Sequence, residues 1–372
     1  MSSKIIFGKW EGTVLLINLI CTQIILGFPR VMTEMAGTAA WITIIYVSVI
    51  MLVAFWLISK LYSRFEGMDI IDISQIAGGG ILRVITGLVM TAYIMYIISI
   101  VLREFAEDMK VIILPESPIS FVTLFFVAGM IVGAYLGLEA IVRLGAIFIP
   151  LITIGFLFIT IGVSPYYDMA NLFPVLGAGP EKIFGEGFFR ISIFSAASIL
   201  FFIAPYIRTN RNFKIVGYAS ILISSCLFLW SVLSYIMVFP YTVSIENFLP
   251  IYQMARLINY GRFFQRVESV FVFIWAATAL LYLSGAFYFI IHIFRKTFKL
   301  EYEKPLIAPF AILIFNISLL PPNLATAIQL EEEYFRKYIW IVTIVFPIIV
   351  LSIANISQKR KKGERKGEKA VE

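Results

Sequence analysis

Charge is scarce in this chain, because only 14% of its 372 residues are charged while 60% are hydrophobic. Soluble domains carry roughly 25% charged residues, so this composition excludes a soluble enzyme. Cysteine is nearly absent too, and Cys21 and Cys226 both lie inside apolar runs, which excludes a disulfide framework and a cysteine-based metal site. His292 is the single histidine. We therefore expect no catalytic constellation and no cofactor.

What the chain has in abundance is apolar runs of the length that an α-helix needs to cross a bilayer, about 20 residues. Ten uncharged stretches predict a polytopic all-α membrane protein. The ninth is short and is stopped by Pro321-Pro322, so a re-entrant course is an alternative for it. The ten predicted spans are Gly12 to Phe28, Thr38 to Leu61, Val84 to Leu102, Ile119 to Leu138, Leu144 to Val163, Phe188 to Ile207, Ile215 to Phe239, Val267 to Ile293, Leu306 to Leu320 and Tyr338 to Ile356.

The basic residues predict the orientation. The N-terminal segment, alternate loops and the C-terminal tail hold 20 of the 30 Lys and Arg residues, which places both termini in the cytoplasm by the positive-inside rule. We expect one transmembrane domain over residues 1–358 and a disordered basic tail over residues 359–372. A basic segment next to a membrane contacts anionic lipid, and we favour this role over nucleic-acid binding. The first apolar run lacks a signal-peptide cleavage pattern.

Two spans carry small, polar and helix-breaking residues. The first contains Thr22-Gln23 and ends in Gly27-Phe28-Pro29-Arg30, and the sixth contains Ser195-Ala196-Ala197-Ser198 and ends in Pro205-Tyr206-Ile207-Arg208. Such positions correspond in two repeats of five helices, and broken helices in transporters built from inverted repeats form the binding site. Small residues also serve close helix packing, which is the alternative interpretation.

A more specific pattern follows the fifth span, where the sequence from Asn171 to Pro180 is Asn-Leu-Phe-Pro-Val-Leu-Gly-Ala-Gly-Pro. This loop resembles the Asn-Leu-x-Pro-Val-Leu-Gly-x-Gly stretch of the B subunits of spore germinant receptors. Further matches follow in the family's order: Gly27 to Arg30, Arg103-Glu104-Phe105-Ala106-Glu107, and Arg266-Val267-Glu268-Ser269 with Trp275. The resemblance covers nearly the whole chain.

The resemblance implies a fold, a function and partners. The fold is that of the amino acid, polyamine and organocation transporter superfamily, an all-α membrane protein of ten transmembrane helices in a five-plus-five inverted repeat with helices one and six broken. The function is to sense a nutrient germinant, such as an amino acid, in the spore inner membrane. The implied partners are a companion membrane subunit and a lipoprotein subunit, with no enzymatic activity and no nucleic acid.

The superfamily's site lies between helices one, three, six and eight, and free backbone amides at the breaks would receive a carboxylate there. Carried over by position, this predicts a ligand pocket formed by Thr22, Gln23, Ile24, Gly27, Tyr93, Ile97, Ser195, Ala196, Ala197, Thr278 and Tyr282. The chain departs from the superfamily where Thr22-Gln23-Ile24 replaces the usual Gly-x-Gly. Either Gln23 contributes an amide to a narrowed pocket, or the ligand is not an ordinary α-amino acid.

An amino acid transporter coupled to protons or sodium is the alternative function. Coupling usually needs an ionisable group near the midplane. We find no Asp, Glu or Lys in the central parts of spans two to ten, although Ser284 is a candidate for a sodium site of hydroxyls and carbonyls. At the outer end of the third span, Arg103 and Glu107 are spaced to pair, and we expect the charges there to contact water. The receptor is therefore the favoured prediction.

Overall fold

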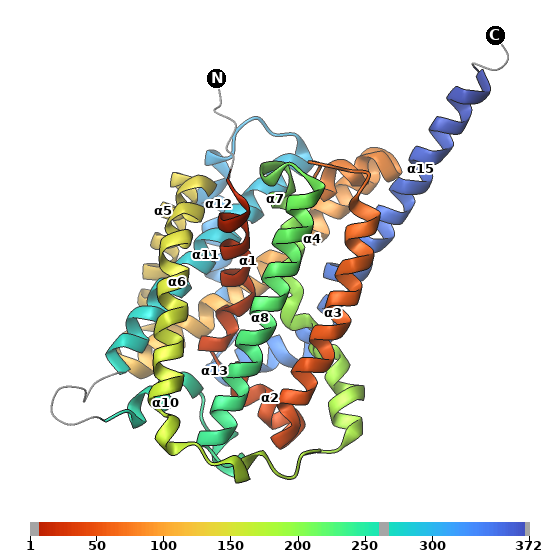
Figure 1. Cartoon of the computed structure of the whole chain (residues 1–372). Coiled ribbons are helices and arrows are strands. Elements are labelled where there is room, and N and C mark those ends of the chain that lie inside the picture. The colour runs from red at the N-terminus through yellow and green to blue at the C-terminus, as the bar shows by residue number, and fades with distance from the viewer. Residues whose placement is uncertain (1–6, 260–267, 369–372) are drawn as a thin grey trace.

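The computed structural model describes residues 7–259 and 268–368, and the elements of this part of the chain are helices (Figure 1). Eight of its helical stretches are long and apolar enough to cross a membrane. The first predicted span is divided between two helices, and α12 (Lys304–Ser318) is a shorter apolar helix. Together these segments correspond to the ten predicted crossings.

The first crossing is broken where the sequence predicts it. Helix α1 (Lys9–Cys21) passes into a short 3-10 turn, η1 (Thr22–Ile25), and the chain resumes as α2 (Phe28–Ala36). Leu26 has φ −89° and ψ −141°, outside the helical region, so the hydrogen-bond ladder stops there. Pro29 lies in the first turn of α2, where a missing N–H costs nothing. The break therefore exposes backbone groups inside the bundle.

The next four crossings are α3 (Ala40–Tyr62), α4 (Ile70–Ile112), α5 (Ile119–Leu136) and α6 (Leu138–Gly162). Helix α4 extends beyond both predicted ends and is kinked at Gly78 and Gly79, which have non-helical backbone angles. A single glycine with φ 88°, Gly137, turns α5 into α6. Residues 139–143 thus belong to α6 rather than to the predicted loop, and Glu139 pairs with Arg143 there at 2.5 Å.

The sixth crossing is irregular over most of its length. After the short turns η3 (Ser164–Tyr166) and η4 (Met169–Leu172), a π-helical turn η5 (Glu181–Gly185) leads into a 3-10 segment, η6 (Glu186–Ile199). The crossing ends as α7 (Leu200–Ile207), which contains Pro205. Runs of 3-10 helix longer than four residues are uncommon and often mark a hinge or strained sequence. The predicted irregularity of helix six is confirmed.

The second half continues with α8 (Asn210–Val238), α9 (Tyr241–Ser244), α10 (Pro250–Leu257) and α11 (Glu268–Phe298). After α12, the last crossing is composed of α13 (Leu324–Gln329), η7 (Leu330–Phe335), α14 (Arg336–Trp340), η8 (Ile341–Val345) and α15 (Phe346–Glu368). Segments η7 and η8 are π-helical. This crossing begins 14 residues before the predicted Tyr338, a correction that matters for the site.

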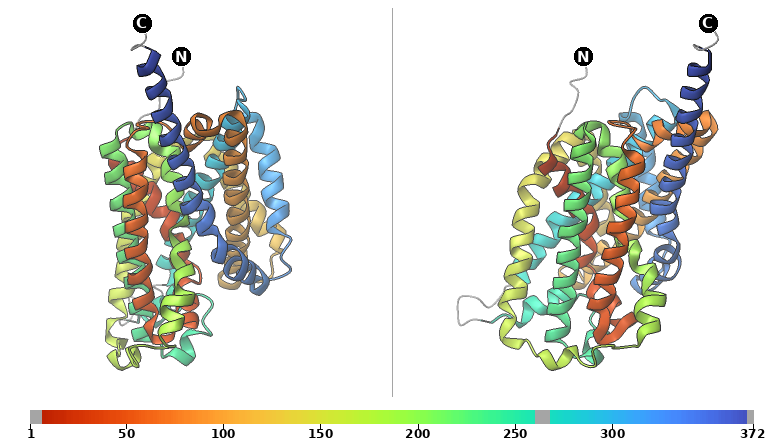
Figure 2. Two further views of the ribbon diagram at one scale, coloured as in Figure 1. Left: turned by 90° about the vertical axis from the view of Figure 1, so that its right-hand side faces the viewer. Right: turned by 45° about the vertical axis from the view of Figure 1, so that its right-hand side comes forward.

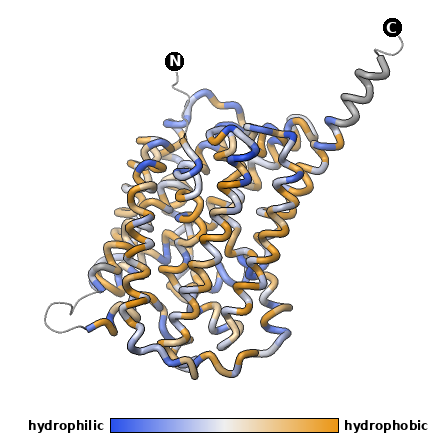
Figure 3. Tube along the Cα trace, in the orientation of Figure 1, coloured by the Kyte–Doolittle hydropathy of each residue, from blue (hydrophilic) through white to orange (hydrophobic). Residues whose placement is uncertain are grey.

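The broken helices lie at the centre of the bundle. Helix α1 packs against α6, α8 and η6. Helix α4 packs against α11 and α15. The views in Figure 2 show α1 enclosed by longer helices, and Figure 3 shows hydrophobic residues along the outer helices. Both α1 and the end of α15 lie at the upper end of the bundle in Figure 1, and α2, α10 and α13 lie at the lower end.

Two predicted features concern the ends of the chain. Helix α15 continues to Glu368 and so includes most of the predicted tail, residues 359–372. The tail's cytoplasmic position, its disorder and its contact with lipid stay predictions. Arg266 and Val267, which carry part of the sequence resemblance, lie outside the described residues.

Candidate ligand-binding site

A small cavity lies where the two broken crossings meet the third and eighth crossings. Its volume is about 40 Å³. Seven of the eleven predicted residues line it: Thr22, Gln23, Tyr93, Ile97, Ser195, Ala196 and Tyr282. We call this space the inner cavity. Since one water needs roughly 10–15 Å³ of such space, the cavity has room for only a few water-sized groups.

Gln23 joins the two broken crossings. Its Nε2 donates to the carbonyl of Ile193 in η6 at 2.9 Å and to that of Ile20 in α1 at 3.1 Å. Ile193 lies within the 3-10 segment and Ile20 in the last turn of α1. Gln23 at the predicted break therefore has a structural role, because its amide joins η1 to η6 and to the end of α1.

Aromatic rings form one wall of the inner cavity. Tyr93 in α4 stacks on Phe335 of the last crossing with ring centroids 5.8 Å apart, and Tyr96 stacks on the same ring at 5.0 Å. The Tyr96 hydroxyl donates to the Leu330 carbonyl at 3.2 Å. Tyr93 and Tyr96 of the third crossing thus pack against the tenth crossing, a contact that the sequence did not indicate.

Four predicted residues lie elsewhere. Ile24 and Thr278 line a separate apolar cavity of about 50 Å³, and the Thr278 hydroxyl donates to Ile274 within α11. Gly27 lines a further cavity at the lower end, and Ala197 packs against the hydrophobic core. The structure therefore brings seven of the predicted residues together at the inner cavity and separates these four from it.

A buried charge cluster, missed at the sequence level, adjoins the inner cavity. Glu331 and Arg336 both line it and form an ion pair with each other. Arg336 also pairs with Glu332 at 3.2 Å, and Glu332 pairs with Arg190 of η6. The run Leu330-Glu-Glu-Glu before Arg336 was the available signal. These charges end the apolar window of the tenth span, but the π-helical turn η7 carries them into the bundle.

The charges on the third crossing are a second correction. The predicted pair of Arg103 with Glu107 is confirmed at 2.7 Å. The expected contact with water is wrong for its neighbours, because Glu104 and Asp108 are only 5% and 4% exposed. Both face a cavity lined also by Gln23 and Glu331. Carboxyl groups just beyond the predicted end of the third span thus lie inside the bundle.

Two further spaces lead from the inner cavity toward the lower end. A cavity of about 30 Å³, the middle cavity, shares Gln23, Leu26, Glu331 and Arg336 with the inner one. An outer vestibule of about 600 Å³ adjoins it at Glu332 and Arg336. The charged cluster consequently lies between the inner cavity and the vestibule.

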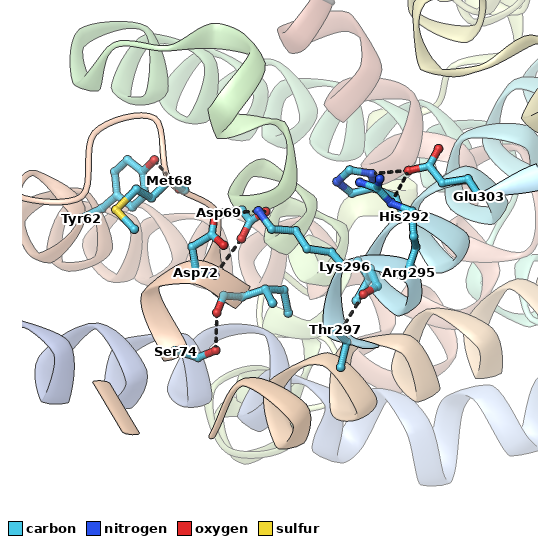
Figure 4. A network of polar contacts seen from close by, with 12 residues as sticks. Tyr62, Met68, Asp69, Asp72, Ser74, His292, Arg295, Lys296, Thr297 and Glu303 are labelled. Atoms are coloured by element: carbon cyan, nitrogen blue, oxygen red, sulfur yellow. Dashed lines mark hydrogen bonds and ion pairs between the residues drawn. The ribbon is translucent and has the colours of Figure 1, made fainter. Parts of the chain in front are cut away.

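Polar contacts close the opposite, upper end (Figure 4). Lys296 of α11 pairs with Asp69, which caps α4, and with Asp72 at 2.6 Å. Glu303, just before α12, forms an ion pair with Arg295 at 3.0 Å and contacts His292 at 2.9 Å. Burial raises the pKa of the Glu303 carboxyl, but the hydrogen bond from His292 and the charges of His292 and Arg295 outweigh it and leave that pKa below its usual value. These contacts tie α11 to α4 and α12.

In the described residues 7–259 and 268–368, ten crossings with two central breaks and a cavity between them define a transporter-like membrane protein. Its fold is similar to that of a sodium-coupled sialic acid symporter in a substrate-bound outward-open state, with a TM-score of 0.64, 12% identity, and coverage of 94% of this chain and 78% of the symporter. It is also similar to the transporter MhsT in complex with L-phenylalanine, with a TM-score of 0.63, 14% identity, and coverage of 95% and 89%. These similarities confirm the predicted five-plus-five fold with helices one and six broken.

The chain belongs to the spore germination protein family, whose model matches residues 8–325. It is 25% identical to Spore germination protein A2 of Bacillus subtilis over 363 residues, covering 95% of this chain and 96% of that protein. It is also 25% identical to Spore germination protein YndE of the same organism, covering 95% and 97%. The predicted family is therefore confirmed over most of the chain.

Proposed function

We propose that this protein is the nutrient-sensing membrane subunit of a spore germination receptor. It binds a small molecule such as an amino acid in the inner cavity, and it signals to a companion membrane subunit and a lipoprotein subunit. The observation that carries the proposal is that seven predicted residues line the inner cavity, beside the breaks of the first and sixth crossings. The chain that forms this cavity belongs to the spore germination protein family. A ligand there contacts both repeats, so its binding favours one arrangement of the repeats over another.

Gln23 provides the direct test. Its replacement with leucine nearly keeps the volume but removes the amide that joins η1 to η6. We expect the protein to accumulate in the membrane and the dose response of germination to the nutrient to shift, because a net hydrogen bond is worth about 0.5–1.5 kcal/mol. Spores that carry the variant are compared with the parent strain for germination against nutrient concentration. An unchanged dose response at normal protein abundance contradicts a ligand site at Gln23.

In this proposal both termini lie in the cytoplasm, and the helical bundle spans the spore's inner membrane. Ala178 is exposed, in the segment after α6 that Figure 1 shows at the lower end of the bundle, so a cysteine introduced there is expected to react with a membrane-impermeant thiol reagent from outside. A cysteine in the tail after residue 358 should react only once the membrane is permeabilised. Mass shifts of the two variants on a gel measure this, and the reverse pattern overturns the orientation.

A secondary active amino acid transporter is the second candidate. Buried Glu104, Asp108 and Glu331 favour it, because proton relays in transporters use carboxyl groups inside the membrane. Accumulation of a labelled nutrient in proteoliposomes that contain this chain alone separates transport from reception.

A further inference from the structure

The middle cavity contains more negative than positive charge. Its lining includes Glu104, Asp108, Glu331 and Glu332 on one side and Arg30 and Arg336 on the other. Arg30 is engaged outside this group, since it donates to the Ile245 carbonyl at 2.8 Å and pairs with Glu34. Arg336 is shared by Glu331 and Glu332. Among the described residues, no lysine or arginine pairs with Glu104 or Asp108.

Neither carboxyl group has a basic partner in the described part of the chain. Glu104 is 5% exposed and lines the middle cavity beside Glu331 and Glu332. Asp108 is 96% buried, lines the middle cavity and, within the described chain, has no hydrogen bond or ion pair. A buried carboxyl without a partner is costly whether or not it holds a proton, because a carboxylic O–H also needs an acceptor.

A protonated amine matches this arrangement. Glu104 and Asp108 are four residues apart on α4, so they lie one above the other on the same helix face. An ammonium group carries one positive charge and three donors, enough for both carboxyl groups and one further acceptor. The middle cavity, about 30 Å³, has room for about two groups the size of water. Metal binding is a poorer fit, since the described residues contain no group of three potential metal ligands.

We propose that Glu104 and Asp108 bind the primary ammonium group of the ligand, and that the rest of the ligand extends past Gln23 and Leu26 into the inner cavity. This deepens the proposed function and rests on it, because it names the class of nutrient as a primary amine, with amino acids among its members. The two spaces share Gln23 and Leu26, so one small molecule reaches both.

The test uses the purified full chain in lipid nanodiscs and measures thermal unfolding with pairs of probes. Each pair joins an amine with its hydroxy analogue: L-alanine with L-lactate, L-valine with 2-hydroxyisovalerate, and L-phenylalanine with L-phenyllactate. A ligand that binds only the folded state raises the unfolding temperature. We expect at least one amine to do so and its hydroxy analogue to have no effect. Equal shifts within each pair, or no shift with any amine, overturn the proposal.

Asp108→Asn is the decisive variant and Glu107→Gln its matched control. Glu107 is the next carboxylate on α4, but it pairs with Arg103 outside the middle cavity. We expect Asp108→Asn to weaken the amine by about tenfold to a hundredfold, because hydrogen bonds to charged groups are worth about 1.5–3 kcal/mol. The ligand-free variant should be at least as stable as the parent, since an unpartnered buried carboxyl has been removed. Undiminished amine binding in Asp108→Asn contradicts the site.

Two further arms keep the causes apart. Exchange of sodium chloride for choline chloride at the same ionic strength should leave the unfolding temperature unchanged. A sodium-dependent stabilisation that Asp108→Asn abolishes assigns the carboxyl groups to an inorganic cation and overturns the ammonium proposal. If spores that lack this chain germinate normally with every nutrient, the proposed function itself fails. If the hydroxy acids bind as well as the amines, only the ammonium site fails.

Discussion

Arg336→Met is expected to destabilise the protein by about 3–5 kcal/mol, because it leaves Glu331 and Glu332 buried without their shared cation. Methionine keeps most of the side chain's apolar length, so lost charge rather than lost packing dominates. Immunoblot abundance in the membrane and the unfolding temperature of the purified chain measure the effect. We expect both to fall.

The controls for Arg336 come from the same chain. Arg143→Met breaks the ion pair between Arg143 and Glu139, whose two side chains are 76% and 46% exposed respectively. This change should lower the free energy of unfolding by no more than about 0–1 kcal/mol. Combining Arg336→Met with Glu331→Gln should restore part of the lost stability, since one uncompensated carboxylate is then neutral. Equal effects of the Arg336 and Arg143 variants, or no recovery in the double variant, refute the assigned role of the buried cluster.

Ala196→Leu is expected to abolish the germination response while the protein accumulates normally. Ala196 lines the inner cavity together with Ile193, three residues earlier. In a 3-10 helix residues three apart share a face, so this side of η6 points at the cavity. A leucine there fills a space of about 40 Å³ that the ligand needs. Germination with the nutrient and immunoblot abundance are measured in the same strain.

Ala197→Leu is the matched control. Ala197 is adjacent in η6 and, like Ala196, packs against the core, but it does not line the inner cavity. A leucine at that position should overpack the bundle at a cost of about 1–3 kcal/mol and lower the abundance. If Ala196→Leu also lowers the abundance, small residues at both positions serve helix packing, and the size argument for the inner cavity is lost.

The ten crossings and both breaks could be predicted because they depend on local sequence. Proline and glycine interrupt helices by their own backbone properties, and apolar runs reveal their length directly. The tenth crossing was predicted too short because Glu331, Glu332 and Arg336 look like a loop when each residue is weighed only with its neighbours. The free-energy cost of burying Glu332 is offset by its contact with Arg190, which lies 142 residues away in the chain. No sequence window contains both residues.

Burial of the third crossing's charges was unpredictable for a related reason. Glu104 and Glu107 have the same chemistry and stand three residues apart, yet one faces a cavity and the other pairs with Arg103. Which face of α4 turns inward is decided by α11 and the tenth crossing packed against it. Of the candidate site, the sequence therefore predicts the contribution of the broken helices better than that of the charged residues beside them.

The π-helical turn η7 determines which charged side chains can meet. Glu331 and Arg336 are five residues apart, and in an α-helix, at about 100° per residue, they would point in directions about 140° apart. The i→i+5 hydrogen bonding of a π turn places more residues in each turn and brings such positions onto nearly one face. The extra residue in the π turn thus determines which side chains lie on the same face of the helix. Reversion of this turn to α geometry would rotate Arg336 away from Glu331 and change the charge beside the cavity without any change of sequence.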